Sequence, residues 1–294
     1  MIFARPDHIS DLETLPRMPS WVTSKRAETL EDVAFLSGAA LNHLHLVLSR
    51  VDLPHALLRE RLALSAAAAC VALSGRPERE AELRDAVHLL RPGDLPGPAG
   101  ATYLAWRRAV ERPVSIKALG RALSAYEPGQ IAGWLDAGQG TPVVRAAMVL
   151  EAVLSEAPRA DVPALILADI ALAQALGWGH LMPLLATGLK RADLRKQGDD
   201  LRFACHRALI SSVVDAERLA ADLARRAAHL KTVAPKLRAK GAGNAVEMFL
   251  TRDAMAPSAL PLPDRAARRL CDRLVDLRAV RELTGRDTFR LYGV

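Results

Sequence analysis

The chain ends on RELTGRDTFRLYGV (residues 281–294), a stretch whose pattern differs from everything that precedes it. Its apolar residues recur at every second position, which is typical of β-strands, whereas the earlier segments show helical spacing. Gly285 supplies the positive φ angle that a tight turn requires. We therefore expect a β-hairpin around residues 284–287, with Phe289 and Leu291 on the same side of its second strand.

Three candidate helices precede this hairpin. The spacing predicts helices over residues 244–251, briefly from Pro257, and over about residues 265–278. This order of three helices and a hairpin is that of a winged helix-turn-helix, in which the third helix enters the DNA major groove and the hairpin is the wing. The apolar positions of the third candidate helix share one face and are Ala267, Leu270, Cys271, Leu274 and Leu277.

The rest of the chain is predicted to be a helical bundle. Half of the 294 residues are apolar but only 4% are aromatic, and Ala and Leu lead the apolar share. Both residues favour helices because they lose little side-chain freedom there. We expect a mainly α protein with three parts: an extended N-terminal segment (1–26), a multi-helix bundle (27–240) and a C-terminal winged helix-turn-helix with one small β-hairpin (241–294).

Positive charge is concentrated directly before the C-terminal part. Residues 189–240 contain 13 Lys and Arg against 6 Asp and Glu, whereas the whole chain has a net charge of +7. A cationic surface attracts polyanions such as nucleic acid. The alternative interpretation is an ordinary solvated helix face, and it is the proximity to a candidate DNA-reading unit that favours a binding role.

From these patterns we expect a non-enzymatic DNA-binding protein that needs no cofactor. Its bundle would mediate self-association or contact with a protein partner. The groove-facing residues would be Arg265, Arg268, Arg269 and Arg273. The phosphate contacts would be Arg286, Arg290, Lys231, Lys236, Arg238 and Lys240. One alternative is a protein-interaction scaffold whose winged helix docks on protein.

Cysteine usage and hydropathy point to a cytoplasmic protein without a membrane span. Cys70, Cys205 and Cys271 lie far apart in the sequence, which argues against a disulfide framework and a zinc site. Residues 161–190 contain a single internal charge, at Asp169, and would be long enough to cross a bilayer. Glycine and proline residues interrupt the stretch, so we expect two buried helices instead.

No motif for phosphate binding, metalloprotease chemistry or a nucleophilic serine occurs in the chain. The strongest enzyme candidate is the group Asp85, His88, Arg91 and Asp94, in which a carboxylate beside an imidazole could transfer a proton. The same residues are also expected at an ordinary helix C-terminus, where basic side chains favour the helix dipole. A second alternative is therefore an enzyme or small-ligand sensor with a pocket in the bundle.

Several long phrases resemble a bacterial family of unknown function, the domain of unknown function 1403. They are FLSGAAL, RLALSAAAACVALSGRPEREAELRDAVHLLRPGDLPGPAG, LAWRR, LARRAAHLKTVAPKLRAKGAG and DRAARRLCDRLVDLRAVRELTGRDTFRLYG. The resemblance covers nearly the whole chain after about residue 30. It implies no activity and carries no catalytic residues over to this sequence.

Overall fold

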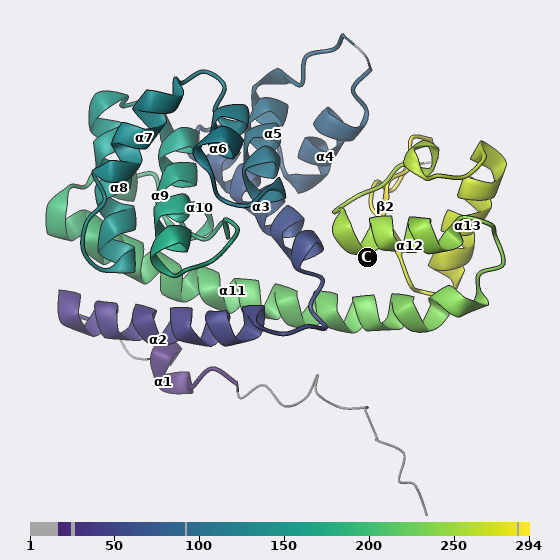
Figure 1. Cartoon of the computed structure of the whole chain (residues 1–294), viewed down its shortest axis with the longest axis horizontal. Helices are drawn as coiled ribbons and strands as arrows, with labels where there is room; N and C mark the ends of the chain where they lie inside the picture. Colours follow the sequence, from purple (N-terminus) through teal and green to yellow (C-terminus); the bar gives the residue numbers. More distant parts are fainter. Residues whose placement is uncertain (1–16, 25–26, 92, 287) are drawn as a thin grey trace, which may run out of the picture.

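The computed structural model describes residues 17–24, 27–91, 93–286 and 288–294. Within them the chain is mainly α-helical, as its composition predicts, with one small sheet (Figure 1). The first ten helices are α1 (Ser20–Ser24), α2 (Leu30–Leu48), α3 (His55–Leu73), α4 (Glu80–His88), α5 (Gly97–Glu111), α6 (Ile116–Ala122), α7 (Pro128–Asp136), α8 (Pro142–Glu156), α9 (Asp161–Ala175) and α10 (Leu185–Gly188). The later elements are α11 (Gly198–Val233), α12 (Ala242–Thr251), α13 (Asp264–Asp276), the strands β1 (Arg281–Glu282) and β2 (Tyr292–Gly293), and the 3₁₀ turns η2 (Asp193–Arg195), η3 (Ala234–Lys236) and η4 (Pro257–Ala259).

The 36-residue helix α11 extends along the molecule and carries the other elements. Figure 1 shows α2 running along one side of it, the bundle of α3 to α10 above its first half, and α12, α13 and the strands at its far end. This region forms one continuous helix. Its buried stripe is unbroken from Leu201 to Val233, so each turn packs against a neighbour.

Two helices that are apolar almost all round form the centre of the bundle. In α3 the buried residues point in every direction around the axis, as expected of a central helix, and α9 is buried in the same way. The segment 161–190 forms α9 and the single turn α10, with Gly177 at a φ of 69° between them. Among the described helices none combines the length and apolar character needed to cross a bilayer.

Helix α10 is held between α9 and α11 by one buried carboxylate and one glycine. Asp169 accepts hydrogen bonds from the backbone N–H groups of Leu184 and Leu185, at 3.1 Å each. Burial raises the pKa of Asp169 to about 8, and the two N–H donors oppose that rise. A Cβ atom on Gly188 would lie 2.7 Å from the Cα atom of Ala208 in α11. The close approach of α10 to α11 therefore requires glycine at this position.

We expect Gly188→Ala to lower the free energy of unfolding by roughly 1–3 kcal/mol, because the backbone of α11 cannot retreat from the added methyl group. Chemical denaturation followed by circular dichroism measures the change. The control is Gly120→Ala in α6, where a Cβ would meet no atom within 4 Å. That variant is expected to be unchanged or more stable by roughly 0.5–1 kcal/mol. Equal effects of both substitutions would contradict the packing argument.

The C-terminal elements occur in the predicted order, with differences in detail. The second helix is reduced to the 3₁₀ turn η4, and α13 starts at Asp264, with Pro263 at the capping position. Strands β1 and β2 pair antiparallel, and Met255 forms an isolated bridge to Tyr292, so β2 lies between β1 and the segment after α12. Three short segments therefore form one small pleated patch against α12 and α13.

The loop of the hairpin is longer than the sequence pattern predicts. Gly285 has the expected positive φ, at 62°, but β1 already ends at Glu282 and β2 does not start until Tyr292. Phe289 also adopts a positive φ, 55°, and is 68% exposed, whereas Leu291 is fully buried. The expected alternation of residues 289–292 is therefore wrong, because the positive φ of Phe289 interrupts the extended backbone that alternation requires. The predicted turn residue Asp287 lies outside the described residues.

The N-terminal part also departs from the expectation of an extended segment. Residues 20–24 form the short helix α1, whose Val22 is 1% exposed and packs between α2 and α11. Trp21 stacks on Phe35 of α2 with ring centroids 5.5 Å apart. Helix α2 then starts with a capping box in which Thr29 and Asp32 exchange hydrogen bonds with each other's backbone N–H groups. The remaining predicted residues, 1–16 and 25–26, lie outside the described part.

Candidate nucleic-acid interface

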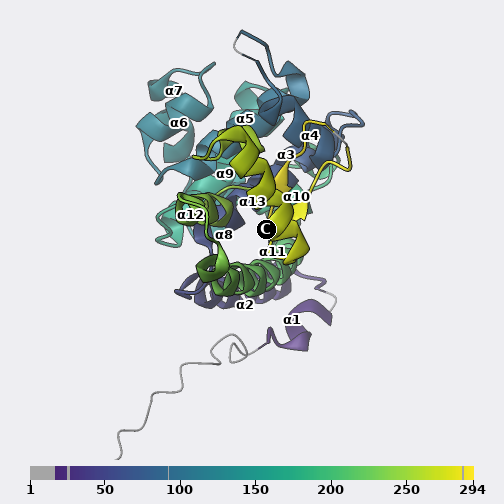
Figure 2. The same ribbon diagram turned by 90° about the vertical axis from the view of Figure 1, so that its right-hand side faces the viewer.

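Helix α13 presents a cationic face at the end of the molecule farthest from the bundle. Its apolar residues, Ala267, Leu270, Cys271 and Leu274, are buried against the C-terminal elements. The opposite face is uncovered, and Figure 2 shows α13 in front when this end of the molecule is viewed directly. The four predicted groove-facing residues Arg265, Arg268, Arg269 and Arg273 are all exposed, and none forms an ion pair with a described residue.

The basic joint between α11 and α12 lies at the same end. Gly241 has a φ of 92°, and a Cβ at this position would lie 3.1 Å from the carbonyl oxygen of Pro261, so the joint packs against the turn that leads into α13. The other end of α13 is tied to α11, because Nε2 of His229 is 2.9 Å from the carbonyl oxygen of Leu277. The structure thus places the joint beside the start of α13, and the predicted joint residues Lys236, Arg238 and Lys240 are all exposed.

Positive charge outweighs negative charge on this end. The exposed basic residues between 231 and 278 are Lys231, Lys236, Arg238, Lys240, Arg265, Arg268, Arg269, Arg273 and Arg278, and the exposed acids are Glu247, Asp264, Asp272 and Asp276. Lys231 lies on the side of α11 that is nearest the loop between α2 and α3. There the pKa of Asp52 is lowered, chiefly by a hydrogen bond from Arg50 and to a smaller extent by Lys231.

The two predicted wing contacts lie elsewhere. Arg286 forms an ion pair with Asp85 of α4, which is 201 residues earlier in the chain. Arg290 donates from Nε to the carbonyl oxygen of Arg286 at 2.9 Å. The tip of the hairpin loop is therefore turned toward the bundle, and Arg286 is held at α4 rather than beside the free face of α13.

A buried ionic network positions the C-terminal elements, and the sequence analysis missed it. Asp253, directly after α12, is fully buried and accepts hydrogen bonds from Nε and Nη2 of Arg84 at 2.7 and 3.1 Å. Arg61 of α3 also pairs with Asp253, and its Nη2 donates to the carbonyl oxygen of Val294 at 2.9 Å. The one available signal was an arginine on the apolar side of α4. This network anchors α12 and β2 to α3 and α4.

A second carboxylate extends the network. Glu60 of α3 is 5% exposed and lies 3.3 Å from both Nε of Arg107 and Nη1 of Arg252. Tyr103 beside it is fully buried, and its hydroxyl has no hydrogen-bond partner among the described residues. Burial, which is the main cause, and the positive charge of Arg107 lower the pKa of His88 to about 4.

The candidate catalytic group is dispersed by this arrangement. Asp85 pairs with Arg286, His88 faces the buried arginines, and Asp94 accepts the backbone N–H of Arg91 at 2.9 Å as a local turn. A cavity of about 420 Å³ beside α4 is lined by Asp85 and Asp94 but not by His88. The carboxylate and the imidazole therefore do not converge on a shared substrate position.

The described part of the chain contains no group of three or more His, Cys, Asp or Glu residues that could hold a metal ion. Cys70, Cys205 and Cys271 are buried and unpaired there, in line with the expectation of free thiols. Burial raises the pKa of each thiol to about 12, so these sulfurs are poor nucleophiles and poor metal ligands.

Together, these features define a mainly helical protein with an uncovered cationic helix at its C-terminal end. The chain belongs to the family described as "Protein of unknown function (DUF1403)", and the match covers residues 6–294. This confirms the resemblance found in the sequence and extends it over almost the whole chain. No curated protein matches the chain.

Proposed function

We propose that this protein binds duplex DNA without catalysing a reaction, through α13 and the joint between α11 and α12. One observation carries the proposal: α13 buries its apolar face and leaves Arg265, Arg268 and Arg269 exposed, without acidic partners among the described residues. An α-helix fits the major groove, and guanidinium groups recognise both phosphates and the edge of guanine. Lys236, Arg238 and Lys240 would then contact the phosphates alongside.

The order of the C-terminal elements supports a winged helix-turn-helix. Helix α12, the turn η4 and helix α13 are followed by β1 and β2, and Met255 adds a bridge to the outer side of β2. In such a unit the helix after the turn is the one that enters the groove. Here the second helix is a single 3₁₀ turn, and of the two predicted hairpin contacts Arg286 reaches a phosphate only when it leaves Asp85.

The first test is the salt dependence of binding. A labelled short duplex titrated with the protein, followed by fluorescence anisotropy, is expected to show an affinity that falls by about a hundredfold or more between about 50 and about 200 mM salt. Each neutralised phosphate releases counterions, which makes the affinity steeply salt-dependent. No binding at about 50 mM salt would overturn the proposal, and so would an affinity that is independent of salt.

The ion pair between Asp85 and Arg286 should weaken DNA binding. We expect Asp85→Asn to raise the affinity about two- to fivefold, since an exposed ion pair is worth up to about 1 kcal/mol and its loss frees one arginine for a phosphate. The affinity should also depend more steeply on salt concentration, as expected when binding releases about one more counterion. Asp94→Asn is the control, because it removes the same charge from the same cavity without touching Arg286. Equal gains for the two variants would mean that net charge alone is responsible.

A protein-interaction scaffold remains the second candidate, because the hairpin and α12 already dock on the protein's own bundle through Arg61, Arg84 and Asp85. Against it stands the exposure of Arg268 and Arg269, which that docking leaves uncovered. The three buried thiols support a reducing, cytoplasmic environment. The bundle would supply self-association or contact with a partner.

A further inference from the structure

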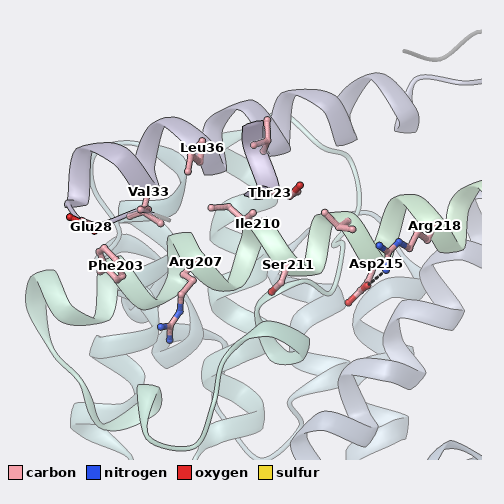
Figure 3. A pocket seen from close by; sticks show the side chains of 13 residues that line it. Thr23, Glu28, Val33, Leu36, Phe203, Arg207, Ile210, Ser211, Asp215 and Arg218 are labelled. Atoms are coloured by element: carbon pink, nitrogen blue, oxygen red, sulfur yellow. Dashed lines mark ion pairs between the residues drawn. The ribbon is translucent and has the colours of Figure 1, made fainter. Parts of the chain in front are cut away.

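A groove between α2 and α11 opens into two connected cavities on either side of α1. The larger, about 1130 Å³, is lined by the second half of α11 and the end of α2. The smaller, about 860 Å³, is lined by the first halves of the same helices (Figure 3). Both share Thr23, Val214 and Arg218, so they meet beneath α1. From Phe203 to Arg225 the lining extends over 23 residues of α11, about 33 Å of helix.

The two cavities differ in chemistry. The smaller has an apolar side, on which Val33 and Leu36 of α2 face Phe203 and Ile210 of α11 (Figure 3). Its charged lining residues are two acids and two arginines, Glu28, Asp215, Arg207 and Arg218, and Arg207 points away from α2, toward Asp193 at 3.6 Å. The larger cavity combines an apolar floor, which includes Val47, Leu53 and Val214, with four arginines. These are Arg17, Arg50, Arg218 and Arg225.

Three of the four arginines have acidic neighbours outside the lining. Nη2 of Arg50 lies 2.8 Å from Oδ2 of Asp52. Among the described lining residues the one acid is Glu217, whose Oε1 lies 3.6 Å from Nε2 of His43. Burial raises the pKa of Glu217 to about 7 and lowers the pKa of His43. Arg218 and Arg225 have acidic neighbours, Asp215 and Asp222, but their side chains are 78% and 71% exposed, so these ion pairs are weak and exchangeable.

From this distribution we propose that the groove is a binding site for an organic acid with an apolar chain. Its carboxylate would pair with Arg218 and Arg225 in the larger cavity, and its chain would pass beneath α1 toward Phe203 and Ile210. Guanidinium groups bind carboxylates in a bidentate manner, and an apolar chain gains free energy with each methylene group removed from water. This inference concerns α2 and α11 and does not depend on DNA binding.

Isothermal titration with four small probes tests the site: butanoate, octanoate, octanol and octylammonium. We expect octanoate to bind at least about tenfold more tightly than each of the other three, because it alone combines an anionic group with a long chain. The double variant Arg218→Gln/Arg225→Gln should weaken octanoate binding at least about tenfold and leave octanol unaffected. Both side chains are exposed, so the fold is expected to survive, as a thermal melt would verify.

Two further variants locate the site. Ala221→Trp places a large ring at an exposed lining position and should weaken octanoate binding at least about tenfold by obstructing the larger cavity beside Arg218 and Arg225. Arg121→Gln/Arg159→Gln changes the same charge on exposed bundle positions outside both linings and should have no effect. Octanoate binding no stronger than that of octanol or octylammonium would overturn the proposal. So would octanoate binding that survives both Ala221→Trp and the loss of Arg218 and Arg225.

Discussion

Reversing two charges on α13, in the double variant Arg268→Glu/Arg269→Glu, is expected to lower the affinity for duplex DNA by at least about a hundredfold. Each guanidinium in contact with a base edge or phosphate contributes roughly 1–3 kcal/mol, and a glutamate at the same position repels the phosphates. Both side chains are exposed and opposite the buried face of the helix, so the fold should be retained. Fluorescence anisotropy at about 50 mM salt measures the loss.

The matched control separates contact from overall charge. Arg121→Glu/Arg159→Glu makes the same change in net charge on exposed positions of the bundle, remote from α13 (Figure 1). If DNA contacts α13, this control should lower the affinity for DNA by less than about fivefold, because exposed charges beyond about 10 Å are largely screened. A loss equal to that of the α13 variant would remove α13 as the contact, as would an α13 variant that binds like the native protein.

Asp253→Ala is expected to cause the largest loss of stability of any single substitution considered, about 3–5 kcal/mol. The change leaves Arg61 and Arg84 partly buried without their shared carboxylate, and an uncompensated buried charge is far more costly than the absence of the whole pair. A thermal melt should shift downward by about 10 °C. Asp276→Ala is the control, since this exposed acid belongs to the same C-terminal elements and should change little.

A double substitution tests the cause of that loss. Replacing Arg84 with methionine removes one of the two stranded charges while keeping an apolar side chain of similar length. The double variant Arg84→Met/Asp253→Ala should therefore lose less free energy of unfolding than the two single variants together, by about 1–3 kcal/mol. Strictly additive losses would show that the carboxylate and the guanidinium are not coupled, and the network would then not be the anchor of the C-terminal elements.

Sequence periodicity predicted the elements because helices and strands depend on near neighbours in the chain. The stripe of Ala267, Leu270 and Leu274 places α13 correctly within two residues. The hairpin was correctly expected near Gly285, but its register was not. A left-handed Phe289 has no sequence signature, because bulky residues other than glycine rarely adopt a positive φ.

In the candidate site, too, local spacing predicted some features and only the fold decided the others. That Arg265, Arg268 and Arg269 lie opposite an apolar stripe followed from helical spacing alone. The sequence could not predict that Arg286 pairs with Asp85 instead of lying beside these arginines. Arg286 and Asp85 are 201 residues apart, so no local pattern connects them. The predicted proton-transfer group failed for the same reason: sequence spacing placed Asp85 and His88 near each other, and the fold gave each a different partner.

By itself, the sequence determined the helical class, the order of the C-terminal elements and the cationic face of α13, because these depend on side-chain size, period and charge along a few turns. Only the tertiary structure decided where that face lies, which arginines remain free and where the α2–α11 groove opens. Those outcomes depend on contacts between residues that are distant in the chain. The position of the C-terminal elements depends on buried ion pairs such as Arg84 with Asp253, because a buried charge requires a partner.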